Sequence, residues 1–461
     1  MADLATSGLL DRAIRRITDA WRDMAAAVAP AEDESIPAQM RACLAARGGE
    51  VSARNRAAKL GEAYLAADAS GRLAFLRDLA SFEADPEAIA QAAARFAEAA
   101  EDASARSAAT AALRRALEPP RLRLLTQFTT IPDGVKFLVD LRAELLALRD
   151  TDAALAGLEA DLRSLLAAWF DIGFLDLQRI DWSAPASLLE KLVGYEAVHE
   201  IRGWRDLKNR LDSDRRCYAF FHPRMPQEPL IFVEVALVQG LSGSVQALLD
   251  QKAPVLDPRE ADTAIFYSIS NCQRGLAGIS FGNFLIKRVV EVLSTEFRNL
   301  RTFATLSPVP GFRRWLAKAL AANPADLLRE GEAAMLRATV PDAASAPAAL
   351  VALLARRGWV RDPETTKLLE PVLLRLAAHY LLTEGRGRRA ADPVAHFHLS
   401  NGARIERLCP LADISDKGVR ESASLMVNYL YDPARIEQNH EDYAGEGRRN
   451  AAQAIRRLLK P

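Results

Sequence analysis

Cysteine and histidine are scarce in this sequence. Among its 461 residues there are 4 cysteines and 6 histidines. The cysteines, Cys43, Cys217, Cys272 and Cys409, lie far apart and include no CxxC pair. Because this spacing fits neither a zinc site nor a disulfide framework, we expect no structural metal, and a reducing compartment is favoured.

Net charge and long hydrophobic runs are absent as well. The 60 basic and 60 acidic residues cancel, so no overall field favours nucleic acid or an acidic membrane, and any anion site must be local. No apolar run approaches the roughly 20 residues that cross a bilayer. The amphipathic first segment contains Asp3, Asp11 and Asp19, which transit peptides avoid, and the final Leu-Lys-Pro is not a peroxisomal signal. We therefore expect a cytoplasmic protein that binds neither nucleic acid nor membrane.

Two common nucleotide-binding motifs are missing. The sequence has no GxGxxG and no GKS or GKT, which excludes a Rossmann fingerprint and a P-loop. Ser307, in LSPVPGF, does not stand in a GxSxG elbow, so it is not expected to be an α/β-hydrolase serine.

Residues 1–168 are rich in Ala, Arg, Glu and Leu, and their apolar residues recur at helical spacing. Leu138, Leu141, Leu145 and Leu148, for example, fall on one helical face. This pattern predicts a bundle of seven or eight helices. The region has no histidine, so we expect a scaffold or oligomerisation domain.

From residue 169 onward, aromatic and β-branched residues become more frequent, which predicts strands. The predicted strands are Cys217–Phe221, Leu230–Leu237 and Thr263–Ile269, and the predicted helices include Asn283–Asn299, Phe312–Ala322 and Val419–Leu430. Residues 324–388 are again rich in alanine and leucine, which predicts helices, and this segment is interpreted as an insertion. Strands and helices do not alternate strictly, so an α+β fold with a mixed sheet is predicted for residues 169–461.

A glycine-rich turn follows the third predicted strand. Gly275, Gly278 and Gly282 precede a helix that is expected to begin at Asn283. Glycines allow positive φ angles, and a helix N-terminus presents N–H groups that suit a phosphate. A tight turn without a ligand is the alternative.

Ser307 stands in the segment LSPVPGF. Pro308 and Pro310 fix the backbone after it and remove two hydrogen-bond donors. The serine is either functional or a cap for the helix expected near Phe312.

His396 and His398 flank one phenylalanine, and alternation in a strand would place both on one face. They could bind a metal, but no third ligand is evident nearby. One of them could instead be a proton donor with a pKa near neutrality. The other histidines, His199, His222, His379 and His440, are interpreted as structural.

Three further polar residues are candidates. Tyr429 and Tyr431 follow a predicted helical run and could direct their hydroxyls into a pocket. Glu234 is an acid within an apolar strand, either a buried functional carboxylate or an outward-facing residue on an edge strand.

Several of these segments together resemble the malonyl-CoA decarboxylase family. The strongest matches are AIFYSIS, GNFLIKRVVEVL, LSPVPGF, FHLSNGA and MVNYLY, with weaker similarity in RRCYAFFHP and EPLIFVEVAL. They cover most of residues 169–461 in consistent order and spacing.

The resemblance implies a helical domain, residues 1–168, that mediates self-association, expected as a homotetramer. It also implies a catalytic domain of the GNAT (N-acetyltransferase) type, residues 169–461. CoA would bind along the glycine turn and the following helix, at Ala277, Gly278, Ile279, Ser280, Phe281, Gly282, Asn283 and Ile286. Ser280 replaces a glutamate of the animal enzymes, so a role for that carboxylate does not transfer.

For the chemistry, the resemblance implies that Ser307 and His398 are catalytic and that Tyr431 lies near the same pocket. The family description also treats the serine as a proton acceptor. The expected reaction converts malonyl-CoA to acetyl-CoA and CO2 without a cofactor, because the thioester itself accepts electrons. A CoA-dependent N-acyltransferase and a non-catalytic acyl-CoA sensor are the alternatives.

Overall fold

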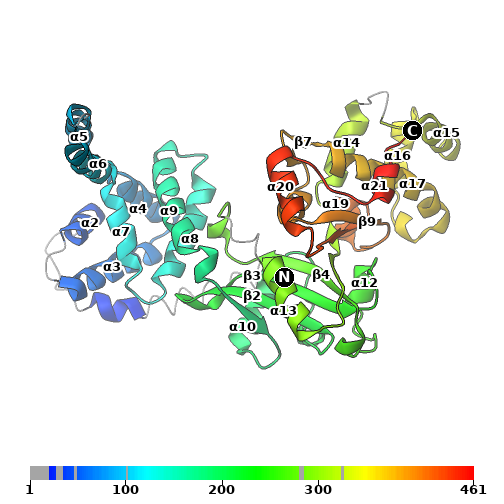
Figure 1. Ribbon diagram of the computed structural model, residues 1–461, viewed down its shortest axis with the longest axis horizontal. Helices are drawn as coiled ribbons and strands as arrows, with labels where there is room; N and C mark the ends of the chain where they lie inside the picture. The colour runs from blue at the N-terminus through cyan, green and yellow to red at the C-terminus, as the bar shows by residue number, and fades with distance from the viewer. Residues whose placement is uncertain are drawn as a thin grey trace.

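The computed structural model describes residues 20–26, 35–45, 49–99, 102–279, 285–322 and 327–460. A helical part, up to residue 169, lies beside a part built around a mixed sheet (Figure 1). None of the helices within the described ranges is both long enough and apolar enough to cross a bilayer.

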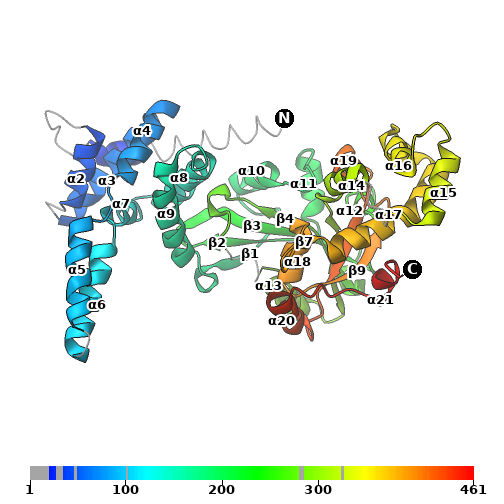
Figure 2. The ribbon, with the colours of Figure 1, turned by 90° about the horizontal axis from the view of Figure 1, so that it is seen from above.

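The first part consists of helices, which confirms the predicted helical character. Its helices are α2 (Ile36–Leu44), α3 (Gly49–Ala66), α4 (Ala69–Ala80), α5 (Pro86–Glu98), α6 (Ala103–Leu117), α7 (Pro120–Phe128), α8 (Gly134–Leu148) and α9 (Ala156–Trp169). Asp68, Asp85 and Asp102 accept hydrogen bonds from backbone N–H groups at the starts of α4, α5 and α6, as good N-caps do. Helices α5 and α6 pack on each other and project from the rest of this part (Figures 1 and 2).

The second part contains an eight-stranded sheet. Its strands are β1 (Asp176–Ile180), β2 (Arg215–His222), β3 (Met225–Val238), β4 (Thr263–Asn271), β5 (Thr302–Thr305), β6 (Ser307–Pro308), β9 (Arg404–Cys409) and β10 (Met426–Leu430). The order is β1-β2-β3-β4-β5-β10-β6, with β9 paired to β10. Only β4 and β5 are parallel; the other pairs in this sheet are antiparallel. The predicted α+β class is confirmed, and the succession of antiparallel strands, crossover helix and parallel strand is that expected of a GNAT-like fold.

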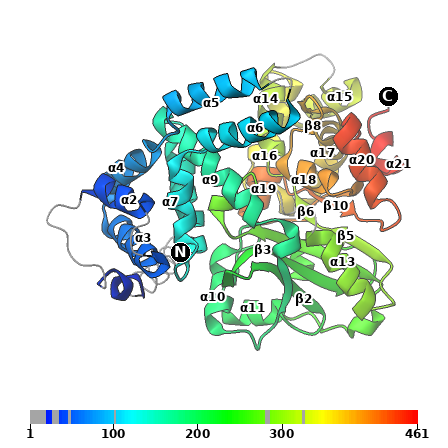
Figure 3. The same cartoon turned by 60° about the vertical axis from the view of Figure 1, so that its left-hand side comes forward.

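Helices surround this sheet. They are α10 (Ala186–Tyr195), α11 (Trp204–Arg210), α12 (Val245–Leu248), α13 (Leu285–Glu296), α14 (Phe312–Ala322), α15 (Glu330–Thr339), α16 (Ala346–Ala355), α17 (Pro363–Thr383), α18 (Pro393–Ser400), α19 (Asp416–Ser422), α20 (Ile436–Glu446) and α21 (Gln453–Arg457). A small hairpin, β7 (Gly385–Arg386) and β8 (Arg389–Ala390), precedes α18. Figure 3 shows α16 to α20 gathered on the side where β5, β6 and β10 lie.

Most predicted elements after residue 169 are found, but the helix predicted over Val419–Leu430 is wrong. Helix α19 ends at Ser422, and Ala423 and Ser424 adopt positive φ angles of 49° and 64°. Left-handed residues end a helix, and the chain continues as β10. The error has a physical cause. Strand β10 is paired on both edges and almost entirely buried, so its residues are apolar on both faces apart from Asn428, and periodicity cannot separate such a segment from a buried helix.

Strands β4 and β5 separate halfway along, and this separation positions the site. Their parallel register runs from Thr263–Thr302 to Phe266–Thr305. After one more hydrogen bond, from the Leu306 N–H to the Phe266 carbonyl, the chain leaves β4 and pairs as β6 with β10. The rest of β4 therefore faces an opening in the sheet.

Candidate active site

A cavity of about 230 Å³ occupies this opening. Its walls come from β4, β6, α18 and the loop after α10. The lining residues are Val198, Phe266, Tyr267, Ser268, Ile269, Asn271, Ser307, Pro308, Pro393, Val394, Phe397 and His398. The two residues expected to be catalytic, Ser307 on β6 and His398 on α18, thus line the same pocket.

Ser307 and His398 form a hydrogen bond, although 91 positions separate them. The Ser307 Oγ lies 2.9 Å from the His398 Nε2. The serine hydroxyl also donates to the Thr305 Oγ1 at 2.9 Å. Ser307 is 6% exposed and His398 2% exposed. Since its hydroxyl is engaged in the pocket, Ser307 is not the cap of α14.

His398 lies on helix α18, so the expectation that His396 and His398 share one face of a strand is wrong. Asp392 caps the helix and Pro393 occupies its first turn, which are strong helix-start signals. The two rings have different partners, because the His396 Nδ1 lies 2.8 Å from the Tyr443 hydroxyl and His398 faces Ser307.

Asp392 connects α18 to the turn after Ser307. Its Oδ1 accepts hydrogen bonds from the backbone N–H groups of Val394 and Ala395, each at 3.0 Å. Its Oδ2 accepts one from the Gly311 N–H at 3.2 Å. One buried carboxylate therefore fixes the helix that carries the histidine relative to the segment that carries the serine.

Two tyrosines hold the His398 ring from behind. The Tyr431 hydroxyl lies 2.8 Å from the His398 Nδ1, and the Tyr429 ring stacks on the imidazole with centroids 4.5 Å apart. Tyr429 lies on β10, Tyr431 directly follows this strand, and both are fully buried, which corrects the expectation that they follow a helix. Tyr431 contacts His398 and is not among the residues that line the cavity.

Burial determines the charge of His398. Complete burial lowers the pKa of His398 to about 3, because the charged form of the imidazole loses its hydration. The imidazole is therefore neutral at physiological pH. The expected pKa near neutrality is wrong for the free protein.

The hydrogen-bond network assigns the ring proton. Because Ser307 donates to Thr305, its Oγ must accept from His398, which places the proton on Nε2. The Nδ1 atom then accepts from the Tyr431 hydroxyl. A continuous donor chain runs from Tyr431 through His398 and Ser307 to Thr305.

The described part of the glycine turn is exposed. Ala277 and Gly278 are exposed, Ile279 is half-buried, and Gly278 has a φ of +76°, which favours glycine. Ser280, Phe281, Gly282 and Asn283, which were expected to bind CoA, lie outside the described residues. Ile286 is fully buried in the core, so it has no exposed surface for the CoA contact that the resemblance implied.

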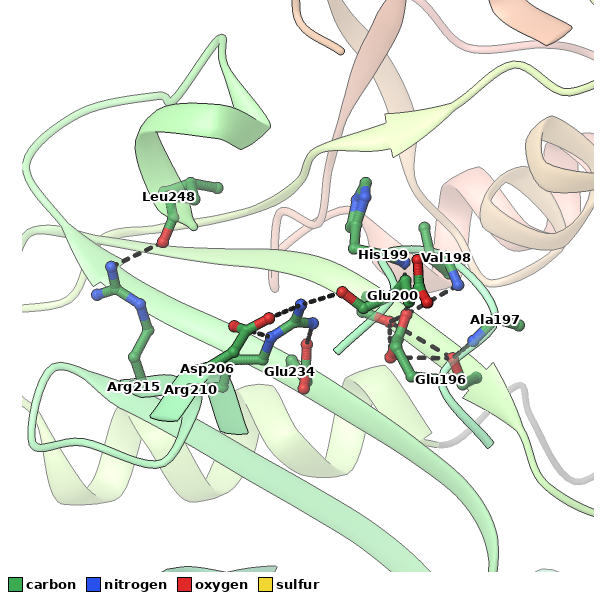
Figure 4. Close-up of polar contacts among 12 residues, drawn as sticks. Glu196, Ala197, Val198, His199, Glu200, Asp206, Arg210, Arg215, Glu234 and Leu248 are labelled. Carbon is green, nitrogen blue, oxygen red and sulfur yellow. Dashed lines mark hydrogen bonds and ion pairs between the residues drawn. The ribbon is translucent and has the colours of Figure 1, made fainter. Parts of the chain in front are cut away.

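A carboxylate supports the loop that bears Val198 (Figure 4). Glu196 accepts hydrogen bonds from the N–H groups of Val198 and His199, at 2.8 and 2.7 Å, and from the Ser268 hydroxyl at 2.7 Å. Val198 and Ser268 both line the cavity. Glu196 thereby joins the loop to β4 and holds this wall of the pocket in place.

Glu234 is fully buried on β3, which lies between β2 and β4. The expectation of an outward position on an edge strand is wrong. Its Oε2 pairs with the Arg210 Nη1 at 2.9 Å, and Arg210 also contacts Asp206 (Figure 4). Burial raises the pKa of Glu234 to about 8, with the Glu196 and Asp206 carboxylates adding to the rise against the opposing effect of Arg210. Glu234 does not line the cavity.

Sequence reasoning missed Thr305 and the role of Tyr429. Each lies two residues before a predicted site residue, Ser307 or Tyr431, in an extended segment. Since alternate residues of a strand share a face, this spacing could have identified both.

The fold and the site define an α+β enzyme of the acetyltransferase-like class, whose candidate catalytic residues, Ser307 and His398, lie where β4 and β5 separate. Comparison with known proteins narrows this class to one family. The profile of the malonyl-CoA decarboxylase C-terminal domain matches residues 173–461, and that of the N-terminal domain matches residues 82–170. The chain belongs to the malonyl-CoA decarboxylase family and is therefore a carboxy-lyase.

Solved structures and curated relatives agree with this assignment. Malonyl-CoA decarboxylase from Rhodopseudomonas palustris is 44% identical with a TM-score of 0.81, and the alignment covers 92% of this chain and 98% of that one. The Agrobacterium vitis protein is 41% identical with a TM-score of 0.83, covering 92% and 100%. The mitochondrial malonyl-CoA decarboxylase of Anser anser anser is 38% identical over 348 residues, which are 73% of this chain and 69% of the goose protein.

Proposed function

We propose that this enzyme converts malonyl-CoA to acetyl-CoA and CO2 with Ser307 and His398 as its catalytic residues. The observation that carries the proposal is the buried hydrogen bond of 2.9 Å between them in the cavity. A volume of about 230 Å³ suits the malonyl thioester end, whereas pockets for drug-sized ligands are larger, about 300–1,000 Å³. The CoA tail would extend outward to the exposed glycine turn.

The chemistry of the thioester supports a reaction without metal or organic cofactor. When the C–C bond to the carboxylate breaks, its electron pair enters the thioester as an enolate and CO2 leaves. The protein must then orient the carboxylate, stabilise the enolate oxygen and protonate the α-carbon. Backbone N–H groups of β4 between Tyr267 and Asn271, beyond its pairing with β5, are the proposed donors to the enolate oxygen.

Ser307 and His398 take the other two tasks. In the proposed complex, Ser307 turns its hydroxyl to the substrate carboxylate and fixes its orientation. This releases the His398 Nε2–H, which moves to the α-carbon while the Tyr431 proton moves to Nδ1. The site carries one negative charge throughout, first on the carboxylate, then on the enolate and finally on the tyrosine, which solvent reprotonates after release of the product.

The test is to incubate the protein with malonyl-CoA alone and to follow acetyl-CoA. Ser307→Ala and His398→Asn should lower turnover by about 10²–10⁴-fold, with CoA binding retained. His396→Asn is the matched control, because His396 shares α18 but not the cavity, and it should keep turnover within about twofold.

Two outcomes would reject the proposal. Product that forms only with an added amine would indicate a CoA-dependent N-acyltransferase, and no product at all would indicate an acyl-CoA sensor. Near-normal CO2 release by either serine or histidine variant would remove that residue from the mechanism.

We also propose a cytoplasmic homotetramer that assembles through its helical part and binds neither nucleic acid nor membrane. Four buried free cysteines suit a reducing compartment, and zero net charge gives no field for polyanions. The goose relative is named as mitochondrial, so cell fractionation is the required test of location.

A further inference from the structure

Arg142 reaches from the helical part to the glycine turn. It lies on α8 and is 1% exposed. Its Nη1 donates to the carbonyl oxygens of Gly275 and Ala277, at 2.5 and 3.0 Å. These two acceptors are the backbone of the turn itself, 133 and 135 residues later in the chain.

Glu159 on α9 fixes the Arg142 guanidinium. Its Oε1 accepts hydrogen bonds from the Arg142 Nε at 3.1 Å and from Nη2 at 2.8 Å. Both ends of the planar guanidinium are therefore engaged, one by the carboxylate and the other by the turn. A rigid fork of this kind is a property of arginine that lysine does not share.

Backbone packing brings α8 to the same turn. A Cβ atom added to Gly275 would lie 1.7 Å from the carbonyl oxygen of Val139 on α8, so only glycine allows this approach. Arg163 on α9 extends the contact, with its Nη2 3.4 Å from the Gly278 carbonyl oxygen. Gly275 thus serves the contact between the two parts of the molecule, and Gly278 remains on the exposed side.

The direction of the carbonyls determines what the turn can bind. The peptide unit that presents the Ala277 carbonyl oxygen to Arg142 turns its N–H group, that of Gly278, the opposite way. The N–H groups of Leu276, Ala277 and Ile279 donate to carbonyls within the turn, so the Gly278 N–H is the one that this turn can offer to an anion on its exposed side. Arg142 holds the carbonyls of residues 275 and 277 toward the helical part. The side of the turn that faces away from α8, where Gly278 is exposed, is then available to bind an anionic ligand.

We propose that Arg142, held by Glu159, is a positioning residue for the phosphates of CoA, so that the helical part contributes to substrate affinity. The proposal rests on the proposed function, because it takes the CoA-linked substrate from there. It assigns to α8 and α9 a role other than self-association. Arg142 lies behind the turn and does not touch the reacting atoms.

The experiment compares Arg142→Lys with Arg121→Lys. Arg121 is the matched control, since it is also a buried arginine of the helical part that binds a carbonyl, of Ala80, and a carboxylate, of Asp161, yet it does not contact the turn. Two substrates are used, malonyl-CoA and malonyl-pantetheine, which lacks the phosphates. CoA affinity is measured separately by calorimetry.

Arg142→Lys should raise the KM for malonyl-CoA and the Kd for CoA by about tenfold, with kcat within about threefold. Its kcat/KM for malonyl-pantetheine should stay unchanged, and Arg121→Lys should change none of these values. Should Arg142→Lys fold poorly, the double variant Arg142→Met/Glu159→Gln removes both buried charges and should show the same selective loss.

An unchanged CoA Kd, or an equal loss for both substrates, would overturn the inference. Failure of the proposed function looks different. In that case the unmodified enzyme gives no acetyl-CoA, while the calorimetric difference between Arg142→Lys and Arg121→Lys persists.

Discussion

The position of one proton on the His398 ring decides how this site can work. A neutral imidazole with hydrogen on Nε2 is a weak acid, but an ester-type enolate carbon is a far stronger base and can take that proton. The buried tyrosines keep the ring neutral and oriented. In the proposed mechanism Tyr431 is the second donor, as in other triads in which a third group orients the histidine.

This charge state predicts the pH dependence of catalysis. Because the pKa of His398 is lowered to about 3, the free enzyme gains no proton there between pH 5 and 8. The kcat/KM for malonyl-CoA should therefore show no histidine inflection near pH 6.5, the ordinary value. A steady-state profile from pH 5 to 9 is the measurement, and a fall in activity around pH 6.5 that matches titration of His398 by NMR would contradict the assignment.

At the scale of elements, the buried carboxyl group of Glu234 on β3 makes the free energy of unfolding depend on pH. Burial raises the pKa of Glu234 to about 8 from its ordinary 4.5. The folded state thus retains a proton that the unfolded chain has lost. The resulting stabilisation is complete below pH 4.5 and is lost as the pH rises through 8.

Glu234→Gln should remove this dependence. As the pH rises from 5 to 8, the free energy of unfolding of the unmodified protein, measured by urea titration, should fall relative to that of Glu234→Gln by up to about 1.4 kcal/mol per pH unit. Glu291→Gln, an exposed change on α13, should leave the slope as it is. If the free energy of unfolding varied with pH in the same way for Glu234→Gln and the unmodified protein, Glu234 would be ionised in the folded state throughout this pH range.

The strands and helices also show which parts of the fold could be predicted from the sequence. Strands β2, β3 and β4 carry strong β-branched and aromatic patterns, and α14 has the helix bounds predicted for it. The short elements α18 and β10 were mistaken for a strand and a helix. Strand β10 is buried on nearly every side, and the eight residues of α18 are too few to show a clear helical period. Their conformation is set by long-range partners, such as Asp392 with Gly311, which a local window does not contain.

For the candidate site, the individual residues were predictable and their connections were not. Ser307 and His398 carry recognisable motifs. The Tyr431 contact, the low pKa of His398 and the Arg142 contact all arise from packing between distant segments. Glycine spacing alone could not separate Gly275, which packs against α8, from Gly278, which has the positive φ angle.

At the scale of the whole molecule, the projecting pair α5–α6 is the expected contact between subunits. Its side chains include Phe96 and Leu117, which are 40% and 53% exposed, and exposed apolar side chains on a projecting hairpin favour burial against another surface. Changing both to Asp should lower the solution mass of the proposed tetramer of 50.4 kDa subunits, as measured by light scattering. Val351→Asp, an exposed apolar residue of α16, is the control, and an unchanged mass for the double variant would exclude this hairpin.

The contact between Gly275 and the Val139 carbonyl oxygen also limits how this protein can be recombined. It leaves no room for a Cβ atom, and the Arg142–Glu159 pair lies beside it. A chimera that joins the helical part of one relative to the sheet part of another would have to match residues 139, 142, 159 and 275 together. The boundary between the two parts is therefore an unfavourable place for a crossover, and the two parts should be inherited as one unit.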